Sequence, residues 1–407
     1  IDGYIDLLAD KVGDEQAVAI VKILDEVTRD SDCYNVSKLF ERHNTGLDFT
    51  HAVLITDRLH NRASRNGMSV AQLIQNYPWV LPQVFGQTGL LAAEKIARDT
   101  AQYLPVNACK ARIFVKLISD LNRGHSYTPY NHLWAALSHD GFSSQVISQA
   151  LMPISLDAAD NNKKGYYIPE PKKYSEQLTN DFISEGHDEE AAEKLSKAVY
   201  LPGVYWSEIK GAEKLAKVLT TKGFAFDEKE IKRRMKKYSD VKLDDDQLAI
   251  AEKLCNNKVT VVTGQAGSGK TTAIKALIKA LQDIICEQVP VLAPTGTAAQ
   301  LVGAKTGADF GTIHRWSRIS IGDDDYAVGT SELSSMEDTK DVPVVVVDEM
   351  SMATVTMLYR LLHIVKPNAR FLFVGDPGQL PSIGAGVFDE LIAIAKMNQD
   401  NMALVEL

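Results

Sequence analysis

VTVVTGQAGSGKTTAIKALIKAL, residues 259–281, is a β-branched strand that runs into a glycine-rich loop and then into a helix. The loop fits the pattern GxxxxGK[ST] from Gly264 to Thr271, and the order strand, loop, helix is the context that this pattern requires. Glycines let backbone N–H groups wrap a phosphate chain at the start of a helix, where the helix dipole favours an anion. Lys270 would then reach the β- and γ-phosphates of ATP, while Thr271 would bind Mg²⁺. The predicted nucleotide-binding residues of this loop are Gly264, Gln265, Ala266, Gly267, Ser268, Gly269, Lys270, Thr271 and Thr272.

The rest of the C-terminal part repeats the alternation of strand and helix. The runs VPVLA, VPVVVVD and RFLFVGD are short and apolar, and helical segments separate them. Buried strands separated by helices indicate an α/β lobe with a parallel sheet. From Ile1 to about Lys237, apolar residues recur at three and four spacing, which is typical of helices. We therefore expect a helical N-terminal domain over 1–130, a helical domain and linker over 131–240, and the α/β lobe over 241–407.

Two of the expected strands end in polar loops. VVVVDEM delivers Asp348 and Glu349 to the carboxyl end of a strand, the edge at which open α/β sheets bind ligands. Asp348 would hold Mg²⁺, and Glu349 would orient and deprotonate the attacking water. In FVGDPGQLPSIGAG, Asp376 and Gln379 lie where an amide could sense the γ-phosphate, although an ordinary DPG turn explains the same residues. The predicted catalytic residues are Lys270, Thr271, Asp348, Glu349 and Gln379.

The overall composition limits the classes of function. The 407 residues carry a net charge of −9, with 45% apolar and 24% charged residues, which is typical of a soluble globular protein and argues against a histone-like coat for nucleic acid. The four cysteines have no CxxC pair and no histidine at metal-ligand spacing, so we interpret them as core thiols. No apolar run approaches the roughly 20 residues of a membrane span, and no signal-peptide pattern opens the chain. We expect a cytoplasmic protein with no membrane partner.

A charged stretch lies at the expected domain boundary, before SDVKLDDDQ. Its cations are Lys232, Arg233, Arg234, Lys236 and Lys237. The stretch favours a solvated helix face that leads into a linker, and a DNA-contacting patch is the alternative.

Together the motifs resemble the first motor lobe of superfamily 1 helicases, and specifically of RecD-like 5′-to-3′ DNA helicases, over about 243–407. The resemblance is carried by LDDDQLAIAEKL, APTGTAA (293–299), TIHRW (312–316), DEMSM and GDPGQLPSIGAG. It implies a RecA-like lobe in which Gln247 reads the adenine ring, and in which APTGTAA and TIHRW hold single-stranded DNA through phosphate contacts. The expected DNA-binding residues are Thr295, Gly296, Thr297, His314 and Arg315. Trp316 would either lie near the strand or pack in the core.

The N-terminal part bears a weaker resemblance to the same family. YPWVLPQVFGQTGLLAAEKIARD is similar to its helix-hairpin-helix portion, and RGHSYTPYNHLWAAL to a segment that follows it. The residues Gly86, Gln87, Thr88 and Gly89 stand where a Gly-apolar-Gly turn is expected. A DNA contact and a purely structural role are therefore both open for this hairpin.

The resemblance implies an ATP-dependent helicase or translocase that acts on single-stranded DNA, or on a duplex with a 5′ single-stranded tail, with recombination and repair proteins as partners. The chain starts without Met and ends in MALVEL, so we expect a fragment that lacks the second RecA-like lobe with its arginine and hydrolyses ATP poorly. One alternative is an ATP-binding partner subunit or scaffold of a recombination nuclease complex. Another is the helicase part of a conjugative relaxase, but His43, His51 and His60 lack the spacing of its metal-binding set.

Overall fold

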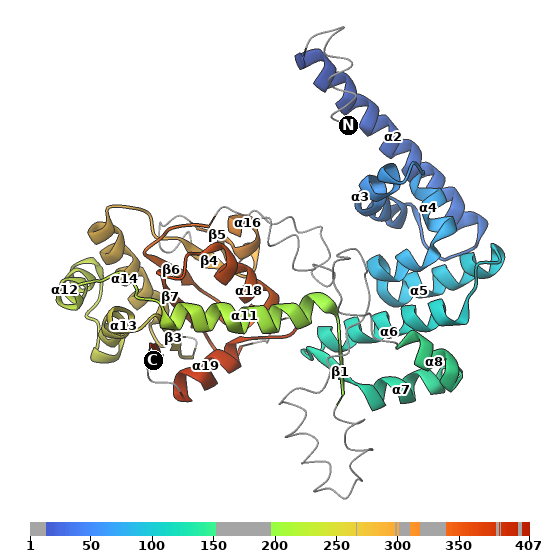
Figure 1. Ribbon diagram of the computed structural model, residues 1–407. Coiled ribbons are helices and arrows are strands. Elements are labelled where there is room, and N and C mark those ends of the chain that lie inside the picture. The colour runs from blue at the N-terminus through green and yellow to red at the C-terminus, as the bar shows by residue number, and fades with distance from the viewer. Residues whose placement is uncertain are drawn as a thin grey trace, which may run out of the picture. The chain divides into compact units, whose positions relative to one another are not determined.

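The computed structural model describes residues 14–151, 197–265, 267–297, 299–300, 310–317, 339–379, 382, 384–397 and 401–407. These residues form two compact units (Figure 1). The first unit comprises residues 14–118 and 129–151, and the second comprises residues 119–128 and the described residues from 197 onward. The three-part division at residues 130 and 240 stays a prediction.

The first unit is helical, as the spacing of its apolar residues predicts. Its elements are α2 (Asp14–Arg42), α3 (Phe49–Arg65), α4 (Val70–Asn76), η1 (Pro78–Val80), α5 (Leu81–Asp99), α6 (Pro105–Asn122), α7 (Tyr130–His139) and α8 (Ser144–Ala150). Capping boxes start two of them: Asp48 and His51 exchange hydrogen bonds at the start of α3, and Ser69 and Gln72 do so at the start of α4. Each box satisfies two backbone N–H groups that the first helical turn leaves without partners, which fixes where the helix begins.

Helix α5 is kinked where the hairpin resemblance lies. Gly86 has φ 54° and ψ −127°, a backbone that glycine adopts far more readily than other residues. A Cβ on Gly89 would lie 2.9 Å from Pro82 N and closer still to the Leu81 carbonyl, so the two halves of α5 meet backbone to backbone. Both glycines thus have a structural reason, and a DNA contact of this turn stays a prediction.

The second unit contains a two-stranded sheet, a six-stranded sheet and the helices around them. Its elements are β1 (Tyr127–Pro129), β2 (Ala198–Tyr200), α11 (Pro202–Thr220), α12 (Glu228–Tyr238), α13 (Asp245–Asn256), β3 (Val259–Thr263), α14 (Lys270–Ile285), β4 (Val291–Ala293), β5 (Phe310–Thr312), α16 (Ile313–Ser317), β6 (Val344–Val347), η2 (Met350–Met352), α18 (Val355–Ile364), β7 (Arg370–Gly375), α19 (Phe388–Met397) and β8 (Met402–Glu406).

The six strands lie in the order β5-β4-β6-β7-β3-β8, and every pair is parallel. Alternate residues of a strand face opposite sides: Val346 and Leu372 enter one core cluster, while Val345 and Phe371 enter the other. Burial on both faces explains why the strands read as continuous apolar runs. The expectation of an α/β lobe with a parallel sheet, preceded by a mainly helical region, is confirmed.

Helices from before residue 240 cover both faces of this lobe. Figure 1 shows α11 alongside α18, and α12 packs against α14, the helix that follows the glycine-rich loop. Ile231 and Met235 of α12 are fully buried in the core that contains α14. These helices are therefore part of the lobe's own packing.

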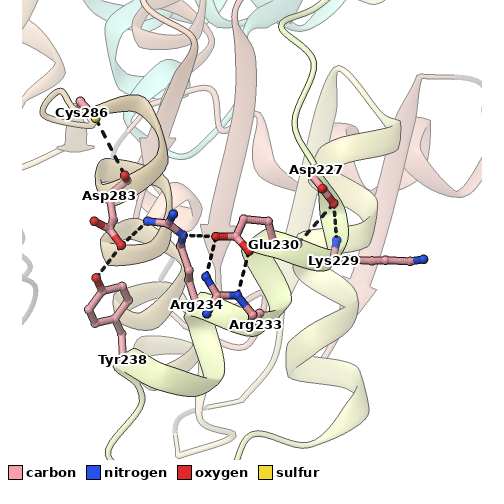
Figure 2. Close-up of polar contacts among 8 residues, drawn as sticks. All are labelled: Asp227, Lys229, Glu230, Arg233, Arg234, Tyr238, Asp283 and Cys286. Carbon is pink, nitrogen blue, oxygen red and sulfur yellow. Dashed lines mark hydrogen bonds and ion pairs between the residues drawn. The ribbon is translucent and has the colours of Figure 1, made fainter.

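Ion pairs occupy part of the charged stretch on α12 (Figure 2). Arg234 contacts Asp283 of α14 and donates to Glu230 at 2.6 Å, and Tyr238 donates to Asp283 at 2.6 Å. Arg233 donates to both carboxylate oxygens of Glu230, and hydrogen bonds from Arg233 and Arg234 lower the pKa of Glu230 to about 2. The stretch thus helps to attach α12 to α14, which supports the helix-face interpretation over the DNA-contacting patch.

The cysteines do not all behave as core thiols. Cys33 and Cys109 are buried and Cys255 is half-buried, but Cys286 is exposed. Cys286 caps the end of α14 with φ 59°, next to Asp283 (Figure 2). The core interpretation is wrong for Cys286 because this residue is the C-cap of α14, at an exposed end of the helix.

Candidate functional site

The glycine-rich loop follows β3, whose five residues are all buried. Gly267 and Gly269 have φ 88° and 86°, in the left-handed region where glycine carries no steric penalty. Helix α14 begins at Lys270, directly after the second of these glycines. The turn therefore brings the loop to the amino end of a 16-residue helix, the end that favours an anion.

Side chains and backbone crowd the inside of the loop. A Cβ on Gly264 would lie 2.7 Å from both Ser268 Oγ and the Leu407 carbonyl, so residue 264 has no room for a side chain. The Lys270 ammonium donates to the carbonyls of Gly264 and Gln265, the latter at 2.7 Å. Thr271 is exposed and Thr272 half-buried at the start of α14, while Ala266 lies outside the described residues.

The acidic pair follows β6 directly. Glu349 has φ 55° and ψ 39°, a left-handed backbone that costs a residue other than glycine about 1 kcal/mol or more. Asp348 stabilises this conformation, because its Oδ1 accepts from the Glu349 N–H at 2.8 Å. The turn directs two adjacent carboxylates to the carboxyl edge of the sheet.

The third loop follows β7. Asp376 is buried, its Oδ1 accepts from Gly378 N at 2.9 Å, and its carbonyl accepts from Gln379 N at 3.1 Å. This is the ordinary turn that the DPG sequence predicts, and it leaves Gln379 exposed. A Cβ on Gly375 would lie 3.1 Å from Ser351 N, so the ends of β6 and β7 approach closely.

The sheet order brings the three loops together. Strands β6, β7 and β3 are consecutive neighbours and parallel, so Glu349, Gln379 and Lys270 all leave the same edge. At about 4.8 Å per strand, the outer two of these strands lie roughly 10 Å apart. The separation suits groups that act on one phosphate chain.

Gln247 lies against the same loop. A Cβ on Gly269 would collide with Nε2 of Gln247, which places this amide beside the glycine-rich turn. Its Oε1 accepts from Asp244 N at 3.1 Å, and its own N–H donates to Asp244 Oδ1 at 2.7 Å. Gln247 therefore closes a capping box at the start of α13. The spacing Asp-x-x-Gln is the sequence signal for this role.

The expected DNA-binding residues follow the next two strands. Ala293 of β4 pairs with Thr312 of β5, so the segments after them leave the sheet side by side. Thr295 is half-buried, and Gly296 and Thr297 are exposed. After β5, His314 is half-buried and Arg315 is exposed, and Arg315 N donates to Thr312 Oγ1 at 3.1 Å.

Trp316 is half-buried at the edge of the core. It packs against the cluster that contains Ile313 and Leu358, and the ammonium of Lys340 lies 4.7 Å from its ring centroid. Such a cation over an indole face stabilises the ring in place. Of the two roles open for Trp316, core packing is the one that these contacts support.

Sequence reasoning missed two buried cations at the opposite edge of the sheet. Lys258 is 3% exposed, and its ammonium donates to the carbonyls of Pro367, Asn368 and Ala369 at 3.0, 2.9 and 2.7 Å. Arg370 donates to the Phe224 and Asn257 carbonyls at 2.7 and 2.5 Å. Burial is the main cause that lowers the pKa of Lys258 to about 8, and the Arg370 guanidinium lowers it further. A lysine before a strand gave no sign of this role.

Among the described residues, no set of three His, Cys, Asp or Glu side chains has the arrangement of a metal site. The described helices include none with the length and apolarity to cross a membrane.

The glycine-rich turn before α14, the acidic pair after β6 and the parallel sheet define a P-loop nucleotide-binding lobe of RecA-like type. Residues 242–406 match the family model described as AAA domain. The ATP-dependent RecD2 DNA helicase of Deinococcus radiodurans is 28% identical over 313 residues, which are 76% of this chain and 39% of that protein. The RecBCD enzyme subunit RecD of Mycobacterium tuberculosis is 33% identical over 158 residues, 35% of this chain and 27% of that protein. The chain is thus similar to RecD-like helicases of superfamily 1.

The chain spans about two fifths of the length of the RecD2 relative and about a quarter of the RecD subunit. A crystal structure of Pif1 helicase from Candida albicans has a TM-score of 0.28 and 18% identity, covering 41% of this chain and 40% of that one.

Proposed function

We propose that the chain is the ATP-binding part of a DNA helicase or translocase that couples ATP hydrolysis to movement on single-stranded DNA. The observation that carries the proposal is the division of labour along one sheet edge. The candidate ATP residues follow β3, β7 and β6, and the candidate strand-binding residues follow β4 and β5. Because the two sets follow neighbouring parallel strands of one sheet, a change at the phosphates could reach the DNA contacts. The 5′-to-3′ direction is proposed from the family resemblance.

The glycine-rich loop fits the phosphates of ATP. Ser268 Oγ is buried without a hydrogen-bond partner among the described residues, and the amino end of α14 adjoins it. The backbone N–H groups of the loop would bind the phosphate oxygens, and Lys270 would exchange its two carbonyl contacts for the β- and γ-phosphates. Thr271 and Asp348 are the residues that would hold Mg²⁺, which when bound neutralises developing phosphate charge.

Glu349 is proposed as the general base. Glu349 lies in the turn that follows β6, and its left-handed backbone shapes this turn. It is adjacent to Asp348, the carboxylate proposed for Mg²⁺. It would orient a water and accept its proton. Gln379 would report the γ-phosphate, since its amide is exposed on the loop that neighbours the glycine-rich loop.

Arg315 is proposed as the main phosphate contact of the strand-binding set, with Thr295, Gly296, Thr297 and His314 beside it. The test is fluorescence anisotropy with labelled single-stranded oligonucleotides of different sequence at several salt concentrations. We expect Arg315→Ala to weaken binding by a similar factor for every sequence and to reduce the salt slope by roughly 0.7 to 1, because a phosphate contact carries no base information.

The matched control is Lys229→Ala, which removes one exposed cation from α12 of the same unit. It should leave affinity and slope unchanged. An Arg315→Ala protein that binds as tightly as wild type, with the same slope, would show that Arg315 has no part in strand binding.

A second candidate is a partner subunit of a nuclease complex. The observation that favours it is the 33% identity with proteins named RecBCD enzyme subunit RecD. Co-purification of nuclease subunits with the chain from its native host would support this role. If the whole protein instead purifies as a single species and has DNA-stimulated ATPase activity by itself, the motor role alone is supported.

A further inference from the structure

One segment of the first unit, residues 49–118, carries a charge opposite to that of the whole chain. Residues 49–118 contain eight Lys and Arg against three Asp and Glu, a net charge of +5, whereas the whole chain has −9. Two of those carboxylates already have cationic or histidine partners within the unit: Glu94 contacts Arg112 at 3.1 Å, and Asp99 contacts His43 at 2.7 Å. Residues 14–48 of the same unit carry eight Asp and Glu against four Lys and Arg, so the positive charge belongs to this segment and not to the unit as a whole.

Helix α3 concentrates cations on one face. Its buried residues are Ala52, Ile55, Thr56, Leu59, His60 and Ala63. At 100° per residue, Arg58, Arg62 and Arg65 fall within an arc of about 60° that lies outside the arc of these buried residues. All three are exposed. They follow one another at about 6 Å and 4.5 Å along the helix axis.

Two of these arginines, Arg62 and Arg65, form no salt bridge with a described residue. Asp57 is the acid within α3, and it contacts Arg29 of α2 at 3.9 Å. Among the described residues, no carboxylate lies within the 4.0 Å of a salt bridge from Arg62 or Arg65. Both arginines lie in the last turn of α3, where a cation also stabilises the helix dipole. This structural role predicts an effect on stability and none on a partner.

We propose that the arginine face of α3, centred on Arg62 and Arg65, binds the phosphate backbone of duplex DNA as a second contact apart from the motor lobe. Guanidinium groups match phosphate oxygens in geometry as well as in charge. Between Arg58 and Arg65 the other exposed residues are Asn61 and Ser64, so this stretch of α3 offers no exposed aromatic ring of the kind on which proteins stack single-stranded bases. A rigid helix with regularly spaced cations suits a rigid duplex backbone and reads no sequence.

The choice of DNA as the phosphate polymer rests on the proposed function, so the experiment omits ATP and single strands. Binding of the 407-residue chain to a labelled blunt duplex is measured by anisotropy across a salt series, for wild type and for Arg62→Ala/Arg65→Ala. We expect the double variant to bind roughly tenfold more weakly at low salt, with a salt slope smaller by about two. Arg62→Lys/Arg65→Lys should recover most of the affinity, because it keeps both charges.

Two controls separate this contact from general effects. Lys222→Ala/Lys229→Ala removes the same charge from exposed positions of the second unit and should leave duplex binding unchanged. Thermal unfolding of the alanine pair is recorded beside binding, because loss of two cations from the last turn of α3 lowers Tm slightly; a lowered Tm with unchanged duplex affinity would overturn the proposal in favour of the helix-dipole role. Unchanged affinity and slope would also overturn it, as would an equal loss in the lysine control. Because Arg315 and the ATP residues are not altered, failure here leaves the motor proposal standing, and failure of the Arg315 test leaves this one standing.

Discussion

Replacing Lys258 with Met should destabilise the second unit, although Lys258 lies at the edge of the sheet opposite the candidate ATP site. The ammonium is 3% exposed and donates to three backbone carbonyls between 2.7 and 3.0 Å. Met keeps the length of the side chain and removes all three donors. The carbonyls belong to the turn that leads into β7, so their loss loosens the start of a central strand.

The expected magnitude follows from those three acceptors. A buried polar group left without a partner costs roughly 1–3 kcal/mol, and carbonyls are the less costly case because each retains a second lone pair and can admit water. Removal of a desolvated ammonium beside the Arg370 guanidinium offsets part of the loss. We expect the free energy of unfolding to fall by about 3 kcal/mol, which for a unit of about 200 residues lowers Tm by roughly 6–12 °C.

The pH dependence gives an independent check. The pKa of Lys258 is about 8 in the folded protein, below its ordinary value of 10.5, so between these pH values the unfolded chain binds more protons than the folded one. The wild-type free energy of unfolding should therefore gain a rising contribution from pH 8 to 10.5, fully present above 10.5 and absent below 8. Lys258→Met should lack that contribution.

Urea unfolding followed by far-UV circular dichroism measures both effects. Lys222→Met, an exposed lysine in the connection between α11 and α12, is the matched control and should unfold like wild type. If Lys258→Met unfolds within about 0.5 kcal/mol of wild type at an unchanged m value, the three carbonyls do not depend on the ammonium and the reasoning is refuted.

Three further outcomes are expected. Lys270→Ala should weaken Mg-ATP binding roughly 10- to 100-fold in calorimetric titration, since hydrogen bonds to charged groups contribute about 1.5–3 kcal/mol, and equal affinities would remove the P-loop assignment. Glu349→Gln in the whole protein should keep ATP affinity and lose about 10²–10⁴ in DNA-stimulated turnover, because an amide cannot accept the proton of water; near-normal turnover would place the base elsewhere. Burial raises the pKa of Glu208, so its folded form binds more protons and stability falls as pH rises above about 4.5. Glu208→Gln should therefore raise Tm at pH 8 and lose that advantage near pH 4, which a thermal series in pH would check.

The local chemistry of the site could be predicted from the sequence because it depends on short stretches. Gly267 and Gly269 adopt the left-handed backbone that a phosphate loop needs, and Lys270 begins the helix that the pattern predicts. The all-apolar run before Asp348 predicted a strand buried on both faces, since only such a strand dispenses with polar alternation. The roles of the site residues stay predictions.

The features that could not be predicted from the sequence are those that depend on which distant segments come together in the fold. Strand β3 lies between β7 and β8, each more than a hundred residues later in the chain, and that order alone gathers three loops at one edge. Both a core role and a DNA contact were open for Trp316, and its packing partners decide for the core. Arg234 of α12 pairs with Asp283, which is distant in sequence. Lys258 carried no local signal at all, because its three acceptors lie more than a hundred residues away. Backbone conformation and strand burial are decided by neighbours in sequence, whereas charge pairing and the satisfaction of buried donors are decided by neighbours in space, which only the tertiary structure supplies.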